Sequence, residues 1–293
     1  MKKILVVLVT TLMIGSPLAV ASAVPSPNAK KTAVLIGIGE YQGRTKSLPG
    51  SAGDAAILRD ALLRNGWEDA NIKLLVNEAA TAANIRGALQ WLVDQSSDDG
   101  FSVFAYSGHV KQKPGDEDRD GEIHDEFIWP EDNDFISDGE LATSLKALRG
   151  DAWISFAGCE SAGFDDGVAS PRRLFTGASQ EIEKGYERPD WRMSVYNGLM
   201  VNEGLLQGQG DVDGNGVVSI QEAFNHAAAI APEMTATQRF GPQHPYIAGG
   251  DGPEWFLSPP PEPDPVVTPE QSDALLDDLL GDSLGNPLGD LLG

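Results

Sequence analysis

The sequence predicts an α/β fold with a mostly parallel central sheet and helices on both faces. Three short apolar runs that are typical of buried strands occupy 31–39, 72–76 and 101–106, and segments with helical periodicity lie between them at 52–65 and 82–93. Strands that alternate with helices at this spacing pair in parallel, and the helices that connect them cover the faces of the sheet.

The pattern continues towards the C-terminus, where each further element has its own signal. The expected elements are a helix at 141–148 behind a capping box at 137–140, strands at 153–157 and 172–178, helices at 195–206 and 220–231, and two short segments at 245–248 and 254–257 that pair at an edge. Residues 110–134 are predicted to form one long, acidic loop.

Both ends of the chain differ in composition from the middle. Residues 1–23 combine Lys2 and Lys3 with an apolar run and a small-residue cleavage site ending at Ala23, which predicts a signal peptide. The apolar run is too short for a membrane span, so we expect an exported protein (secreted, periplasmic or in the cell envelope) that has no span in its mature form. Residues 258–270 form a proline-rich linker, and 271–293 an acidic, Leu- and Gly-rich tail that is expected to be mobile and could bind a partner.

Charge and cysteine content narrow the function further. The formal net charge of −23 repels nucleic acid and anionic membranes and is compatible with divalent cations, so no nucleic-acid partner is expected. The chain has one cysteine, Cys159, and therefore no internal disulfide. An unpaired cysteine in an exported protein is a candidate reactive thiol, although a free cysteine can equally be a small buried hydrophobic residue.

Two predicted strand ends carry the candidate catalytic groups. His109 follows the strand at 101–106, and Cys159 follows the strand at 153–157. Because ligands bind at the carboxyl edge of a parallel sheet, both side chains are expected at one cleft. There the imidazole would raise the thiolate fraction and protonate a leaving amine, and the backbone N–H groups of Gly108 and Cys159 would stabilise an oxyanion.

A family resemblance supports this interpretation. The segments KTAVLIGIGEY, LPGSAGDAAILRDALLRNGW, VFAYSGH and DEFIWPEDNDFISDGEL, together with the cysteine strand, resemble bacterial metacaspases and orthocaspases, which share a clan with legumain. The 50-residue spacing from His109 to Cys159 also agrees with that of caspases. The resemblance covers about 31–257. It implies a caspase-like three-layer sandwich over 24–257 and a cysteine endopeptidase with His109 and Cys159 as its dyad.

The resemblance also identifies candidate specificity residues. In this family, acids in the substrate pocket favour Arg or Lys before the scissile bond; Asp54 matches one acid, and Ser107 matches a pocket neighbour. Two positions depart from the pattern, because Val110 stands where Gly is usual and Ala157 where a second acid is usual. Cleavage after Arg or Lys is therefore an open expectation.

Residues 211–222 match the twelve-residue calcium loop of an EF-hand. The expected ligands stand at positions 1, 3, 5, 7, 9 and 12, and Gly216 makes the turn; the ligands are Asp211, Asp213, Asn215, Val217, Ser219 and Glu222. A turn that keeps the pattern without binding calcium is the alternative, and a dockerin-like module would require a second copy. A run of acids at 116–120 lacks the final acid of such a loop, because Phe127 stands there. The family resemblance implies a second calcium site built from Asp125, Asp138 and Asp166.

Two functions follow from these residues. The first is an exported, calcium-dependent, caspase-like cysteine endopeptidase that acts on proteins or peptides, with Arg172 and Arg173 as a candidate self-processing site. The second is a catalytically inactive calcium-binding surface or interaction protein that retains the fold, which the changed residues around Cys159 and the acidic surface allow.

Overall fold

A six-stranded sheet forms the centre of the computed structural model, which describes residues 29–115, 121, 123–252 and 254–259. The strand order is β11-β8-β7-β3-β1-β2, and five strands run parallel while β11 is antiparallel to β8. The strands are β1 (Lys31–Gly37), β2 (Ile72–Val76), β3 (Phe101–Ser107), β7 (Asp151–Ala157), β8 (Arg173–Gly177) and β11 (Tyr246–Gly249). The mostly parallel sheet confirms the predicted fold class.

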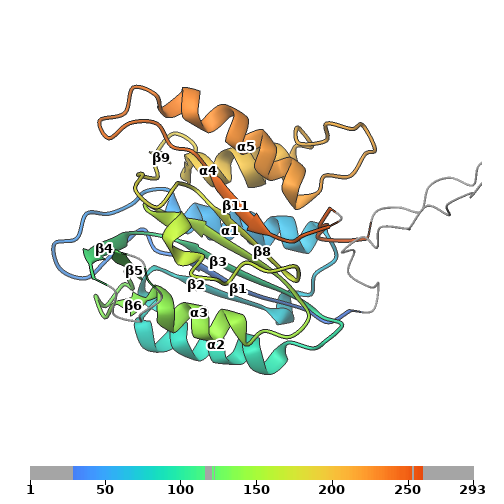
Figure 1. Ribbon diagram of the computed structural model, residues 1–293, viewed down its shortest axis with the longest axis horizontal. Coiled ribbons are helices and arrows are strands. Elements are labelled where there is room, and N and C mark those ends of the chain that lie inside the picture. The colour runs from blue at the N-terminus through green and yellow to red at the C-terminus, as the bar shows by residue number, and fades with distance from the viewer. Residues whose placement is uncertain (1–28, 116–120, 122, 253, 260–293) are drawn as a thin grey trace, which may run out of the picture. The chain divides into compact units, whose positions relative to one another are not determined.

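Helices cover the sheet on both faces (Figure 1). On one face, α1 (Ser51–Arg64) and α5 (Ile220–Thr235) enclose a core with Leu35, Val103 and Trp153 of the sheet. On the other face, α2 (Ala82–Gln95) and α3 (Asp138–Lys146) enclose a core with Ile36, Phe104 and Phe156. Every residue of β3 is buried, and so are the last six of β7, which explains why these strands appear in the sequence as continuous apolar runs.

Three predicted elements differ from the structure. The segment 195–206 is a short helix α4 (Val195–Asn197) followed by a π-helix η4 (Gly198–Leu206), in which Gly204 lets the backbone approach Ala223 of α5 closely. The segment 254–257 does not pair with 245–248, because β11 pairs with β8. The predicted 110–134 loop contains β4 (Val110–Pro114) and β5 (His124–Ile128), which form a small sheet with β6 (Ile136–Ser137). Because many of their side chains are polar, the hydrophobic pattern does not indicate this pairing.

Shorter elements complete the described chain. Three-residue or four-residue 3-10 turns occur at η1 (Asp69–Asn71), η2 (Asn77–Ala79) and η3 (Ser161–Phe164), and β9 (Glu187–Arg188) pairs with β10 (Met193–Ser194). The predicted signal peptide, most of the linker and the tail lie outside the described residues, as do the acids at 116–120.

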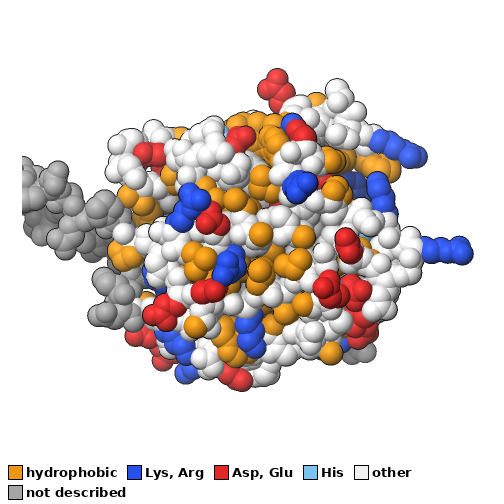
Figure 2. Space-filling view, turned by 180° about the vertical axis from the view of Figure 1, so that it is seen from behind, with side chains coloured by type: hydrophobic (Ala, Val, Ile, Leu, Met, Phe, Trp, Pro, Cys, Tyr) orange, Lys and Arg blue, Asp and Glu red, His pale blue; other side chains and the backbone are white. Residues whose placement is uncertain are grey.

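Charged and hydrophobic side chains share the face that Figure 2 shows. On the face in Figure 2, acidic and basic side chains are interspersed, and hydrophobic side chains gather between them. Within the described residues, none of the helices has the length and apolar character needed to cross a membrane.

An aromatic cluster around Phe156 should dominate the stability of the central sheet. The Phe156 ring stacks on Phe164 with centroids 4.5 Å apart and lies 5.6 Å from Phe175. Because Phe156→Ala removes a fully buried ring, it should lower the free energy of unfolding by about 3–5 kcal/mol in urea titrations. Ile182→Ala is the control, since Ile182 is 81% exposed and its truncation should change stability by less than about 0.5 kcal/mol. Equal effects of the two variants would contradict the central role of this cluster.

Candidate active site

The pairing of β3 with β7 brings the histidine and cysteine turns together. Ser107 and Ala157, the last residues of these neighbouring parallel strands, are register partners. His109 and Cys159 each follow two residues later, so both lie just beyond the same sheet edge. The two turns are linked directly, because the Gly108 N–H donates a long, 3.4 Å hydrogen bond to the Ala157 carbonyl. The predicted proximity of the two turns is therefore present in the fold.

The two side chains line one cavity of about 300 Å³. Its walls come from the strand ends, from the loop before α1, and from the segment 178–187 that follows β8; they include His109, Cys159, Lys46, Ser51, Ala157, Lys184, Glu187 and Ser194. A cavity of this size can receive a substrate side chain and the adjoining peptide bond.

A backbone carbonyl orients the His109 imidazole. Nε2 lies 2.7 Å from the Lys46 carbonyl oxygen, which can only accept a hydrogen bond, so Nε2 carries the proton and Nδ1 is the nitrogen that can accept one. The Tyr41 and Trp129 rings lie 5.1 and 5.8 Å from the imidazole. Burial lowers the pKa of His109, the Lys46 carbonyl raises it, and the Lys46 charge lowers it. The pKa of His109 is lowered on balance, so the imidazole is neutral at neutral pH.

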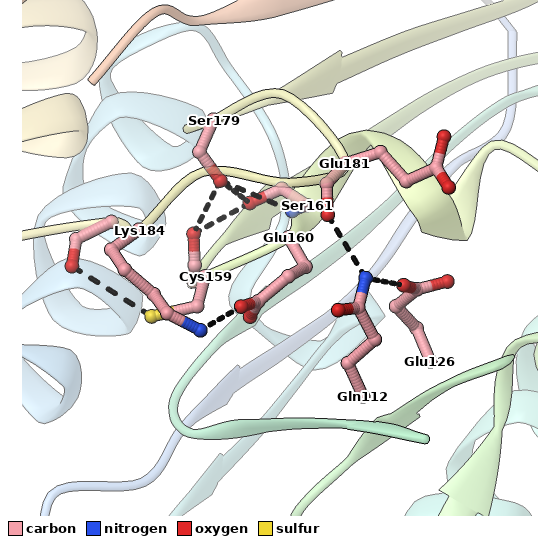
Figure 3. Close-up of polar contacts among 10 residues, drawn as sticks. Gln112, Glu126, Cys159, Glu160, Ser161, Ser179, Glu181 and Lys184 are labelled. Atoms are coloured by element: carbon pink, nitrogen blue, oxygen red, sulfur yellow. Dashed lines mark hydrogen bonds and ion pairs between the residues drawn. The ribbon is translucent and has the colours of Figure 1, made fainter. Parts of the chain in front are cut away.

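The Cys159 thiol lies under the segment that follows β8. Its Sγ is 3.9 Å from the Gly185 carbonyl oxygen (Figure 3). Burial raises the pKa of the Cys159 thiol, and the negative charge of Glu160 raises it further, whereas the Gly185 backbone and the Lys184 charge lower it. The resting pair is thus a neutral thiol and a neutral imidazole, and a proton must leave the thiol before it can attack a carbonyl.

The turn after the cysteine is fixed by several contacts. Glu160 is 3% exposed, adopts a left-handed conformation at φ 48°, and forms an ion pair with Lys184 (Figure 3). Its N–H donates to the Glu183 carbonyl at 2.8 Å. The Ser161 and Ser179 hydroxyls both donate to the Gly158 carbonyl, at 2.7 and 3.1 Å. These bonds hold the thiol at the cavity wall.

The predicted specificity residues Asp54 and Ser107 lie behind the cavity. The Ser107 hydroxyl donates to Asp54 at 2.6 Å, and the Ser194 N–H donates to the other oxygen at 2.8 Å. Burial raises the pKa of Asp54 to about 6 against the lowering effect of these bonds. The main cavity has Ser194 and Ala157 in its wall, and Asp54 and Ser107 line a separate space of about 10 Å³. Their role in specificity stays a prediction.

The loop 211–222 brings carboxylates together at the start of α5. Ligand oxygens of Asp211, Asp213 and Glu222 lie within 4.8 Å of one another, the only such group of three among the described residues. Asp211 accepts backbone N–H groups of Asn215 and Gly216 at 3.1 and 2.9 Å, which folds the loop around its oxygens.

One ligand atom of that loop lacks a partner. Glu222 Oε2 accepts the Ser219 N–H at 2.8 Å, whereas Oε1 is buried and has no hydrogen-bond partner in the described structure. A buried carboxylate oxygen without a partner is costly, and a bound cation would remove that cost. The residues present therefore fit a calcium ion.

The second predicted calcium set is not gathered in the same way. Asp125, Asp138 and Asp166 do not form a close group of three in the described chain. Asp138 accepts the backbone N–H groups of Glu126 and Gly139, which engages both of its oxygens.

The candidate self-processing site spans the turn before β8, where Arg172 is exposed, and the first residue of that strand, Arg173. Arg173 belongs to β8, which pairs with β7 on one side and β11 on the other, and its guanidinium binds the Lys146 and Leu148 carbonyls at 2.7 and 2.8 Å. Cleavage after Arg173 would require the start of β8 to open, whereas Arg172 is accessible, so self-processing at this site stays a prediction.

Comparison with known proteins shows which part of the chain is similar to a peptidase family. Residues 31–163 match the family model described as metacaspase, peptidase C14 domain, and this segment contains both His109 and Cys159. The similarity to the metacaspase family covers this segment, which is less than half of the chain. Metacaspase-3 of Arabidopsis thaliana is 38% identical over 120 residues, which is 38% of this chain and 32% of that protein. Metacaspase-1 of Candida albicans is 34% identical over 132 residues, or 40% and 29% of the two chains.

These similarities have a limited extent. The alignments span about a third of the length of the curated metacaspases. The crystal structure of protein GSU0716 from Geobacter sulfurreducens matches over 79% of this chain and 98% of that chain, with a TM-score of 0.56 and 16% identity. At this identity the likeness is one of fold. It confirms the caspase-like α/β sandwich beyond the segment that the family model matches.

The thiol pKa can be tested by alkylation. Because burial and Glu160 raise the pKa of Cys159, its rate of reaction with iodoacetamide should rise with pH through an inflection above that of N-acetylcysteine measured in parallel. Glu160→Gln should move the inflection to lower pH, since it removes a negative charge and leaves Lys184. The rate is followed by intact mass. An inflection below neutral pH in the unmodified protein would show a thiolate–imidazolium pair instead.

Proposed function

We propose that the protein is a caspase-like cysteine endopeptidase with His109 and Cys159 as its catalytic dyad. The observation that carries the proposal is that both residues follow paired ends of neighbouring parallel strands and line one cavity. The metacaspase peptidase match supports a cysteine peptidase, and a peptidase acts on protein or peptide substrates.

The geometry suggests how the reaction proceeds. Nδ1 of His109 takes the Cys159 proton as Sγ attacks the substrate carbonyl carbon, and that proton then passes to the departing amine when the C–N bond breaks. The product is a thioester. Water attacks the thioester with His109 as base, the C–S bond breaks, and the thiol regains a proton. The Gly108 and Cys159 N–H groups would hold the oxyanion; the 3.4 Å bond that Gly108 now makes is long enough to be exchanged for a stronger one.

Replacement of the dyad residues tests this directly. Cys159→Ala should abolish hydrolysis of fluorogenic peptides ending in Arg, Lys, Asn or Asp, and His109→Ala should reduce it by at least about 100-fold, because the thiol loses its base. Ser170→Ala, outside the cavity, is the control and should retain the rate. Hydrolysis that persists in purified Cys159→Ala protein would refute the proposal.

The inactive interaction protein remains the competing function. The neutral thiol and its contact with the Gly185 carbonyl favour it. Covalent labelling at neutral pH by a peptide that carries an electrophilic carbonyl separates the two, because labelling requires both peptide binding and an activated thiol. Labelling of the unmodified protein but not of His109→Ala supports the peptidase; no labelling with or without calcium supports the interaction protein.

We further propose that the loop 211–222 binds Ca²⁺. Asp211, Asp213, Asn215, Ser219, Glu222 and the Val217 carbonyl would hold the ion, and the partnerless Glu222 oxygen supports this set. The family-implied site at Asp125, Asp138 and Asp166 stays a proposal, as do calcium-dependent cleavage, export, and a partner for the tail.

Calcium titration tests the loop without any peptidase assay. Calorimetry should show saturable Ca²⁺ binding, and thermal unfolding should shift upward with added Ca²⁺, by an amount equivalent to about 2.7 kcal/mol at 100 times the dissociation constant. Glu222→Gln should weaken binding by at least about tenfold, because it removes the charge of the last ligand. Glu233→Gln, later on α5, is the matched control. Equal binding by the two variants would exclude this loop.

A further inference from the structure

The cavity contains an acid that the sequence analysis did not single out. Ala157 stands where the resemblance leads one to expect a pocket acid, and Asp54 lies behind the wall. Among the described residues that line the cavity, Glu187 is the one carboxylate. It comes from β9, within the segment that also places Gly185 against the thiol. The carboxylate of the cavity therefore lies on β9, whereas the family resemblance places it at the end of β7.

Two hydrogen bonds fix the direction of the Glu187 side chain. The Gly50 N–H and the Ser51 hydroxyl donate to its two oxygens, at 3.1 and 3.0 Å, at the start of α1. Across the β9–β10 pair, Glu187 is the register partner of Ser194, whose N–H binds Asp54 at 2.8 Å. Both carboxylates therefore lie close to Ser194. Glu187 lines the cavity, and Asp54 lines the separate small space behind it.

The bonds to α1 leave Glu187 able to bind a cation. The two carboxylate oxygens can together accept about four hydrogen bonds, and the backbone of Gly50 with the hydroxyl and backbone of Ser51 supplies three, so a position remains for a guanidinium or ammonium group. Burial raises the pKa of Glu187, whereas Ser51, Gly50 and the Lys46 charge lower it. The alternative role of Glu187 is purely structural, as a cap for α1, where Gly50 provides no side-chain cap.

The positive groups of the cavity do not cancel this carboxylate. Lys184 is ion-paired with Glu160, which lies next to the thiol. Lys46 is exposed, and it orients His109 through its backbone carbonyl. A long cationic substrate side chain that enters beside Cys159 would therefore meet Glu187 as its available acid.

We propose that Glu187 binds the side chain of an Arg or Lys before the scissile bond and takes the part of the acid that is missing at Ala157. The inference rests on the proposed peptidase function. It makes specificity depend on β9 rather than on the strand that carries the cysteine.

The test compares an arginine peptide with its citrulline counterpart, which has the same shape and no charge. Binding to catalytically silent Cys159→Ala protein is measured by fluorescence anisotropy, so the result does not depend on turnover. The arginine peptide should bind at least about tenfold more tightly than the citrulline peptide, and adding Glu187→Gln should remove most of that difference by weakening arginine binding alone. Thermal unfolding of Glu187→Gln checks that α1 remains folded.

Controls separate this inference from the peptidase proposal. Glu78→Gln makes the same chemical change on an exposed residue outside the cavity and should keep the arginine preference. Loss of the preference in Glu187→Gln supports the inference even if the unmodified protein cleaves neither peptide, which would refute the peptidase proposal alone. A preference that survives Glu187→Gln, or one that is absent from the start, overturns the assignment of Glu187.

Discussion

The parallel pairing of β3 with β7 is the constraint on which the candidate site depends. Both strands are buried almost throughout, so a shift of register by one residue would exchange the side chains that face the two cores. The register that satisfies both cores also aligns Ser107 with Ala157, and the turns that follow then place His109 beside Cys159. The proximity of the two turns is thus a consequence of hydrophobic packing, so a change in the core is expected to alter the cavity.

The sequence predicted the parts of this arrangement that leave a hydrophobic or chemical pattern. Continuous apolar runs located β3 and β7, and a histidine and a lone cysteine at strand ends indicated the site. The Lys46 carbonyl could not be predicted, because every residue carries a carbonyl and only the fold brings this one to Nε2. Glu187 was not predicted for a related reason. β9 has two residues and no periodicity, so only the fold, which places Glu187 opposite Ser194, identifies it as a cavity residue. The β4–β5 pair was missed because polar strands lack the alternating pattern.

The departure at Ala157 is easier to understand with the neighbouring charges in view. Glu160 is already buried beside the cysteine, and its negative charge raises the pKa of the thiol. A second carboxylate at 157, on the same strand end, would raise the thiol pKa further by the same repulsion. An acid on β9 approaches the cavity from the far wall, where Gly50 and Ser51 stabilise it. With the acid at 187 instead of 157, a substrate cation would be bound without a further negative charge beside the thiol.

Ser194 connects the cavity with the elements that pack against the loop 211–222. Its hydroxyl caps α4 by accepting the Asn197 N–H at 3.0 Å, and α4 continues into the π-helix on which α5 packs. A cation held by Glu222 would fix the start of α5 and, through that packing, the π-helix and the cap. Ser194 lines the cavity, and its N–H binds Asp54. A shift of the cap would therefore also shift the cavity wall beside Glu187. If calcium changes the rate of cleavage, it should act on substrate binding more than on the chemistry of the thiol. The reason is that Cys159 and His109 are held by the sheet and not by α5.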